Sequence, residues 1–318
     1  MGRYILRRLL INIPVLIGIT FMIFVFIETA PGDPLSFWVN PELGQSEEQL
    51  ALLRERFGLN DPFMVRYVRW LGQALQGNLG FRYKNFESVS ASIAGRVQPT
   101  LLLIGSAMAL GIFTGIPLGT LSALKQYSVL DFTLTAFAFL GISFPAFFAG
   151  LGGLYLFALK WKLVPVGGMY TMGQDPTLLD TIHHLALPAV ILSLAYVASL
   201  MRYTRSSMLE VMRQEYVITA RAKGLKESLV IFRHALRNAL IPIVTIIGLS
   251  LPNLIGGAVF METIFAWPGL GRLYIDGAQS RDYPMVMGMA LITSVMVLAA
   301  NLLTDVVYAF VDPRIRYE

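Results

Sequence analysis

The side chains that could carry out chemistry are few in this sequence. It contains no cysteine, which excludes zinc–thiolate sites, iron–sulfur clusters and cysteine nucleophiles. Its only histidines are His183, His184 and His234, and each lies near the end of a long apolar segment. An intramembrane protease would need a nucleophile that faces a base inside the bilayer. Ser143 and Ser250 lie within apolar segments, away from these histidines, so we expect no catalytic residue and no enzyme activity.

Metal binding and ion coupling are also poorly supported. The pair His183–His184 could contact nickel or copper, which imidazole suits, but two histidines at a membrane boundary are more often structural, so we expect no metal site and no cofactor. Glu28, Glu262 and Asp305 all lie at the ends of apolar segments, where a carboxylate can reach water. A proton- or sodium-coupled pump would carry acids at mid-membrane. A transporter built from this chain would therefore take its energy from elsewhere, or be a passive channel.

The composition is that of an integral membrane protein. Of 318 residues, 55% are hydrophobic and 14% are charged, whereas soluble domains have about 45–50% apolar and about 25% charged residues. A net charge of +5 on so apolar a chain does not indicate a nucleic-acid partner. The partner that the composition predicts is membrane lipid.

Six uncharged segments approach or exceed the roughly 20 residues that a helix needs to cross the hydrocarbon core. We therefore predict an all-α polytopic membrane protein with six transmembrane helices. The first segment is too long for a cleaved signal peptide, so we expect it to be retained. The six segments are Leu9–Ile27, Val97–Leu124, Phe132–Leu159, Leu185–Met201, Ala239–Met261 and Tyr283–Thr304.

The basic residues predict the orientation of these spans, because short cytoplasmic loops are enriched in Lys and Arg. The short segments on one side carry only Lys160, Lys162, Arg272 and Arg281. We therefore expect both termini in the cytoplasm of a prokaryotic cell. The other side carries Arg3, Arg7, Arg8, Lys125, Arg202, Arg205, Arg213, Arg221, Lys223, Lys226, Arg233, Arg237, Arg314 and Arg316.

The segment between the first two spans is predicted to lie outside the cell and to contain two short amphipathic helices. Ser46–Gln49 is a capping-box pattern for the first, which Gly58 would end. Asp61–Pro62 would begin the second, and Gly77 would end it. These helices could cap the bundle or dock a soluble partner. The apolar stripe expected for the second helix is Val68, Leu71 and Leu75.

Proline and glycine residues occur within the spans. Each proline removes a backbone donor, so we expect it to bend or interrupt its helix. Gly111, Gly115 and Gly119 in the second span would let another helix approach closely. The prolines are Pro14, Pro117, Pro145, Pro188, Pro242 and Pro252. Four polar or helix-breaking positions are candidates for lining a translocation path: Pro145, Asn253, Asn301 and Asp305.

The loop between the fourth and fifth spans, residues 202–238, is the most informative stretch. Its pattern is helical, breaks at Gly224 and then resumes. Such a helix–glycine–helix element beneath the membrane suits the groove of a partner protein. On charge alone, a basic juxtamembrane loop held by lipid headgroups is the preferred interpretation.

This loop resembles the coupling loop of ABC importer permeases, in the subgroup for dipeptides, oligopeptides and related ligands. The resemblance is carried by Glu215–Leu225, in which Ile218-Thr219-Ala220 replaces the general Glu-Ala-Ala, and by His234–Ala239. Asn78 stands where many relatives carry Asp. Further matching motifs are Ala30–Pro34, Phe57–Leu59, Gly77–Gly80, Glu262–Gly271 and Asp312–Arg314, so the likeness covers nearly the whole chain.

The resemblance implies a transmembrane permease subunit that pairs with a second, homologous permease around a central path. Two cytoplasmic ATPase subunits would supply the energy, consistent with the absence of a phosphate-binding G-x-x-x-x-G-K-[ST] motif here. An extracytoplasmic binding protein would deliver peptides; relatives also carry nickel chelates and glutathione-like ligands. Residues 1–95 would form the first transmembrane helix and the outer segment, and residues 96–318 the permease core. The residues implied to contact an ATPase are Ala220, Arg221, Ala222, Lys223, Gly224 and Leu225.

Overall fold

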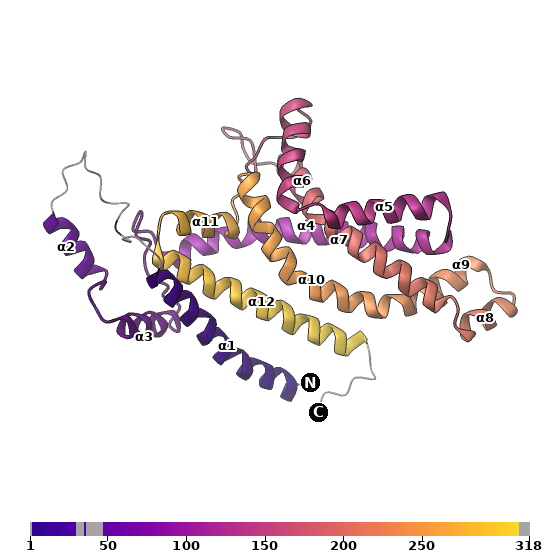
Figure 1. Ribbon diagram of the computed structural model, residues 1–318, viewed down its shortest axis with the longest axis horizontal. Coiled ribbons are helices and arrows are strands. Elements are labelled where there is room, and N and C mark those ends of the chain that lie inside the picture. Colours follow the sequence, from indigo (N-terminus) through magenta and orange to yellow (C-terminus); the bar gives the residue numbers. More distant parts are fainter. Residues whose placement is uncertain (1, 30–34, 36–46, 312–318) are drawn as a thin grey trace. The chain divides into compact units, whose positions relative to one another are not determined.

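The computed structural model describes residues 2–29, 35 and 47–311, and its regular elements there are helices (Figure 1). The only extended pairing among these residues is an isolated bridge between Phe81 and Ser88. The all-α prediction is therefore confirmed. The elements are α1 (Gly2–Thr29), α2 (Glu47–Arg56), α3 (Phe63–Ala74), α4 (Val89–Leu124), α5 (Val129–Ser143), α6 (Ala146–Gly153), the π-helix η2 (Leu154–Lys160), α7 (Leu178–Val211), α8 (Glu215–Ala222), α9 (Glu227–Leu229), the π-helix η3 (Val230–Leu236), α10 (Arg237–Ile264), α11 (Leu270–Gln279) and α12 (Tyr283–Val311).

Each of the six predicted apolar segments lies in helical structure. Five continuous stretches are long and apolar enough to cross a membrane, and a pair of helices bent by 101° would be the sixth. The bent pair joins α5 to α6 and η2, so the third predicted segment is a broken helix. The continuous stretches are Ile5–Thr29, Val89–Leu124, Leu178–Val211, Glu227–Pro252 and Tyr283–Val306.

The prolines do not all interrupt their helices. At Pro145 the helix stops, because Phe144 and Pro145 both take extended backbone angles, with ψ of 123° and 131°. The other five prolines lie inside the continuous helices α1, α4, α7 and α10 and do not interrupt them, so at these positions a bend stays the prediction. A membrane helix accommodates the single lost hydrogen bond when its neighbours satisfy the freed backbone group.

The chain divides into two compact units: Met1–Gln98 with Pro268–Leu298, and Pro99–Trp267 with Ala299–Glu318. In the first unit, α3 packs on α1 through Tyr67. The Tyr67 hydroxyl lies 3.0 Å from Thr20 Oγ1 and donates to the Ile17 carbonyl at 3.0 Å. The two short helices predicted for this segment are present, and their place outside the cell stays a prediction. The predicted stripe was wrong, since Val68 and Leu75 are exposed while Tyr67 is buried. The buried hydroxyl and ring contacts with α1 decide which face of α3 packs.

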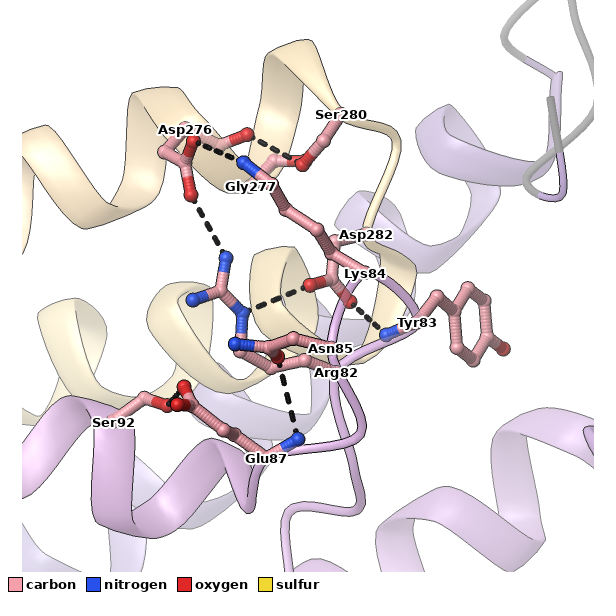
Figure 2. A network of polar contacts seen from close by, with 10 residues as sticks. All are labelled: Arg82, Tyr83, Lys84, Asn85, Glu87, Ser92, Asp276, Gly277, Ser280 and Asp282. Atoms are coloured by element: carbon pink, nitrogen blue, oxygen red, sulfur yellow. Dashed lines mark hydrogen bonds and ion pairs between the residues drawn. The ribbon is translucent and has the colours of Figure 1, made fainter. Parts of the chain in front are cut away.

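A second structural feature of this unit is a network of ion pairs around Arg82, shown in Figure 2. The Arg82 guanidinium donates to Asp282 at 3.1 Å and to Asp276 at 2.8 Å. The Tyr83 N–H donates to Asp282, and Lys84 Nζ donates to Asp276, at 3.0 and 3.1 Å. Burial alone would lower the pKa of Arg82, but the two carboxylates outweigh it and raise that pKa above its ordinary value. The network fastens the segment after α3 to α11 and to the start of α12.

The second unit has a core built on close contact between α4 and α7. Gly111, Gly115 and Gly119 lie on one face of α4, where an added Cβ would collide with α7. At Gly115 that atom would lie 2.9 Å from the Val197 carbonyl oxygen, and at Gly111 it would overlap the ring of Tyr196. The prediction that these glycines permit a close helix approach is confirmed.

Some features expected from the sequence lie outside the described residues. These are the motif at 30–34, Ser46 of the capping-box pattern, and the tail at 312–318 with Arg314 and Arg316. The helix that Ser46 was expected to cap is nonetheless present as α2, and Gly58 beyond it has a φ of +64°.

Candidate functional site

The candidate coupling segment runs from the end of α7 through α8, Gly224 and α9 into η3. It is the helix–glycine–helix element expected from the sequence, with one further break between Val211 and Glu215, where α7 and α8 separate. Gly224 has a φ of +74°, a backbone region that side chains disfavour. Its N–H donates to the Arg221 carbonyl, and the Leu225 N–H donates to the Ala220 carbonyl, so α8 ends in a Schellman motif.

The segment has a small interior of its own. Val217, Ala220 and Val230 pack together beside Val211. Ala220 is only 6% exposed, so this residue holds α8 against the start of η3 and presents little surface. Ala222, Lys223 and Gly224, by contrast, are exposed at the turn. The six predicted residues therefore form one tip, of which Ala220 is the internal support.

An ion pair closes the turn around Gly224. Arg221 Nη2 donates to Glu227 Oε1 at 2.7 Å, and Arg221 Nε lies 3.2 Å from both carboxylate oxygens. This hydrogen bonding raises the pKa of Arg221 above its ordinary value. Because Arg221 is satisfied within the segment, it serves to fix the shape of the turn. Lys223 forms no ion pair with any described residue.

The base of the segment is anchored to the membrane helices. Met208, Ala235 and Ala239 pack with Ala123 at the end of α4. Ser207 Oγ donates to the Ala239 carbonyl at 3.0 Å, which joins α7 to α10. A displacement of the whole segment would therefore move the adjoining ends of α4, α7 and α10 with it.

A buried ion pair above this base was not predicted from the sequence. Arg205 of α7 makes two parallel hydrogen bonds of 2.7 Å to the carboxylate of Asp131, which is nearly inaccessible. Ser122 Oγ and the Tyr127 N–H donate to the same carboxylate. The pair ties the turn between α4 and α5 to α7. The sequence did single out Asp131, because it is the only acid between the second and third apolar segments.

The tip and its flanks expose large apolar side chains. An isolated loop held only by lipid headgroups would favour a basic surface, whereas these side chains mix with cations in the manner of a protein contact. The segment is a compact projection with a shaped end, and such a projection can enter a groove on another protein. The exposed apolar residues are Tyr216, Ile218, Leu225, Leu229 and Phe232.

The four candidate path residues all belong to the second unit, on three elements. Pro145 is exposed at the start of α6, Asn253 lies within α10, and Asn301 and Asp305 are half-buried on α12. These residues therefore stay candidates that are spread over three elements.

Two sequence expectations about polar side chains need correction or comment. Glu262 was expected to reach water, but its side chain is fully buried and accepts a hydrogen bond of 2.6 Å from Thr100 Oγ1. His183 and His184 bond backbone carbonyls: His183 Nε2 lies 2.9 Å from the Leu163 oxygen, and His184 Nδ1 lies 2.9 Å from the Asp180 oxygen. Within the described ranges, no group of three His, Asp or Glu could hold a metal ion.

The sequence matches known protein families over nearly its whole length. Residues 115–317 match the family described as binding-protein-dependent transport system inner membrane component, and residues 1–104 match the N-terminal region of such components. The chain is 45% identical to the oligopeptide transport system permease protein AppB of Bacillus subtilis, over 100% of both chains. It is 40% identical to the dipeptide transport system permease protein DppB of Escherichia coli K12, again over 100% of both.

Solved structures show the same fold. A chain of the MetNI methionine ABC transporter in an inward-facing conformation superposes with a TM-score of 0.57, covering 70% of this chain and 96% of that one at 17% identity. A chain of an amino acid ABC transporter has a TM-score of 0.51 at 14% identity, covering 70% and 94%.

Proposed function

Because the chain belongs to the family of binding-protein-dependent transport system inner membrane components, we propose that it is the permease subunit of an ATP-driven importer of short peptides. The peptide assignment is supported by the names of full-length relatives that are 40–45% identical, AppB and DppB. The protein itself is non-catalytic in this proposal, and a separate ATPase subunit hydrolyses ATP.

The observation that supports the proposal is that the tip of the coupling segment is already folded into a defined shape. Ala220 supports it from inside, Gly224 turns it, and the Arg221–Glu227 pair fixes it before any partner is present. A preformed tip loses little conformational freedom on docking. We propose that the exposed residues Ala222, Lys223 and Leu225 enter a cleft of one cytoplasmic ATPase.

The remaining parts of the assembly follow from the same premise. A second, homologous permease would complete the path, two ATPases would bind below, and a binding protein would deliver ligand from outside. Both termini would be cytoplasmic, and lipid would contact α1, whose apolar surface is largely exposed. Residues 1–95 would form the first span with the outer segment, and residues 96–318 the permease core. Pro145, Asn253, Asn301 and Asp305 are retained as path candidates.

The test uses the complete transporter reconstituted in vesicles with its binding protein and a labelled pool of short peptides. Ala222→Asp and Gly224→Asp place bulk and charge at the exposed tip, so peptide uptake and peptide-stimulated ATP hydrolysis should fall together by at least about tenfold. Ala220→Asp should have the same functional effect but should also loosen the segment, because its carboxylate would be buried without a partner.

Gln174→Asp is the matched control, since it adds the same charge to an exposed loop before α7 and should leave uptake unchanged. Co-purification of the ATPase should be weakened by Ala222→Asp and unaffected by the control. Full uptake by both tip variants would refute the coupling role. Full-rate peptide movement by the purified chain without any ATPase would refute the importer itself.

A further inference from the structure

The broken span exposes an elbow, which we define as residues 143–148. Here α5 ends at Ser143 and α6 begins at Ala146, and the two helices meet at 101°. Figure 1 shows α6 leaving the end of α5 almost at a right angle. The peptide backbone is therefore neither helical nor paired with a strand at this point of an otherwise apolar span.

The elbow leaves backbone hydrogen-bonding groups without partners. The Phe144 N–H still donates to the Leu140 carbonyl, but Pro145 has no N–H to offer the next carbonyl. At the start of α6, the Phe148 and Ala149 N–H groups share the Pro145 carbonyl, while those of Ala146 and Phe147 bond no described residue. Two helix ends thus present free carbonyls and free amides to the same place.

The side chain of Ser143 adds to this polar surface. On the same helix, Thr133 Oγ1 donates to the carbonyl of Val129 at 2.8 Å, as hydroxyl groups on membrane helices commonly do. The Ser143 hydroxyl forms no hydrogen bond with the described residues, and it is exposed. An exposed hydroxyl beside free backbone groups needs water or another polar partner.

The position of the elbow along the span makes lipid an unsuitable neighbour. The 15 residues of α5 start next to the polar turn at 125–128. At 1.5 Å per residue, α5 rises about 22 Å, which is less than the roughly 30 Å of the hydrocarbon core. Non-helical backbone at membrane depth is tolerated only where protein buries it or where it lines a water-filled cavity.

The described residues do not bury the elbow, since Ser143, Phe144 and Pro145 are exposed. The glycine face of α6 packs on its neighbours: Gly150 approaches Met261 of α10, and Gly153 approaches Ile191 of α7. Phe148 points away from this face and is 59% exposed. Phe147 lies beside Phe260 of α10, with ring centroids 6.3 Å apart. The exposed surface therefore combines free main-chain groups with phenyl rings.

We propose that the elbow lines the water-filled translocation path and contacts the peptide as it passes, an inference that rests on the proposed function. The free carbonyls and amides of residues 143–147 match the hydrogen-bonding groups of a peptide main chain. The rings of Phe144, Phe147 and Phe148 offer apolar contact to side chains of varied shape. Such contacts are not sequence-specific, and they suit a path that many short peptides use.

Because this chain has no cysteine, single cysteine variants of it can be tested in the whole transporter in vesicles, with labelling read on this chain. Ser143→Cys and Phe148→Cys place a thiol on the elbow, whereas Phe113→Cys and Phe137→Cys place one on exposed positions of continuous helix in α4 and α5. A charged, membrane-impermeant thiosulfonate, present on both faces of the membrane, reacts with thiolates in water. The elbow thiols should react at least about tenfold faster than the two controls.

A pool of short peptides supplied with the binding protein should slow the reaction of the elbow thiols and leave the controls unchanged. Reaction of the elbow as slow as that of the controls would overturn the inference, and disulfide formation with a cysteine on the second permease would show a subunit interface instead. Fast reaction that peptides do not slow would overturn the ligand contact. ATP-driven uptake by the unmodified transporter, measured in the same vesicles, separates these failures from a failure of the proposed function. Ser143→Cys changes one atom, so folding is not expected to limit the test.

Discussion

The Arg82 network and the coupling segment satisfy their charges in different ways. In the Arg82 network, residues about 200 positions apart in the sequence meet, and the side chain of Asp282 is only 1% exposed. In the coupling segment, Arg221 and Glu227 are six positions apart and both remain partly exposed. The first arrangement holds together elements that are far apart in the sequence. The second fixes a local shape and leaves large apolar side chains uncovered.

This difference indicates which charges stabilise the fold and which prepare a surface. A buried charge that loses its partner is strongly destabilising, whereas an exposed pair contributes little to stability. Mutations at Arg82 should therefore act on the whole first unit. Mutations at the tip of the coupling segment should act on docking and leave global stability nearly unchanged.

The largest expected effect is that of Arg82→Met. It keeps the apolar stem but leaves Asp282 buried without its cation, so the free energy of unfolding should fall by about 3–5 kcal/mol. Thermal unfolding of the purified protein in detergent measures this loss. Arg69→Met is the control, because Arg69 and Asp61 form an exposed pair and should contribute less than about 1 kcal/mol. Equal losses in the two variants would contradict the distinction drawn between buried and exposed pairs.

A smaller, local effect is expected from Gly224→Ala. No atom would collide with the added methyl group, so the change isolates the strain of a left-handed backbone. The strain should destabilise the α8 turn by about 1–2 kcal/mol. Hydrogen exchange of the amides in residues 215–230 should become faster, while the global unfolding temperature stays the same. Gly224→Asn tolerates this backbone region better and should show a smaller change.

The smallest expected effect is on how the stability of the folded protein changes at acidic pH. Partial burial alone would raise the pKa of Asp276, but the hydrogen bonds from Arg82 and Lys84 outweigh it and hold that pKa below its ordinary value. The folded protein therefore gains stability from Asp276 above the ordinary pKa and loses it as the pH falls through the lowered one. At 44% exposure the contribution is screened by water. Unfolding measured from pH 6 downward should have a shallower acid slope in Asp276→Asn; an unchanged slope would exclude this role.

Local features of the fold were predictable from the sequence. The apolar segments, the two outer helices and the end of α8 at Gly224 depend on periodicity and on residues that break helices. The glycines of α4 were also informative, because a row of small residues has a direct steric meaning. The family resemblance added the position of the coupling segment, whose role stays a prediction.

Long-range pairing was not predictable. Nothing near Arg82 in the sequence indicates Asp276 or Asp282, and the position of Asp131 between two apolar segments does not indicate Arg205 as its partner, since such partners are determined by the folded chain. The elbow shows a subtler limit. Among the six prolines named in the sequence analysis, only at Pro145 does the preceding residue also leave the helical region, which a single sequence does not reveal.

The glycine row on α4 has a mechanical consequence. Because the backbones of α4 and α7 touch, with Tyr196 seated over Gly111, neither helix can slide or roll past the other without a steric clash. The nine residues from Gly111 to Gly119 keep the two helices interlocked over about 12 Å. A force applied to α7 at the end next to the coupling segment would therefore tilt α4 and α7 together, as one rigid pair of helices.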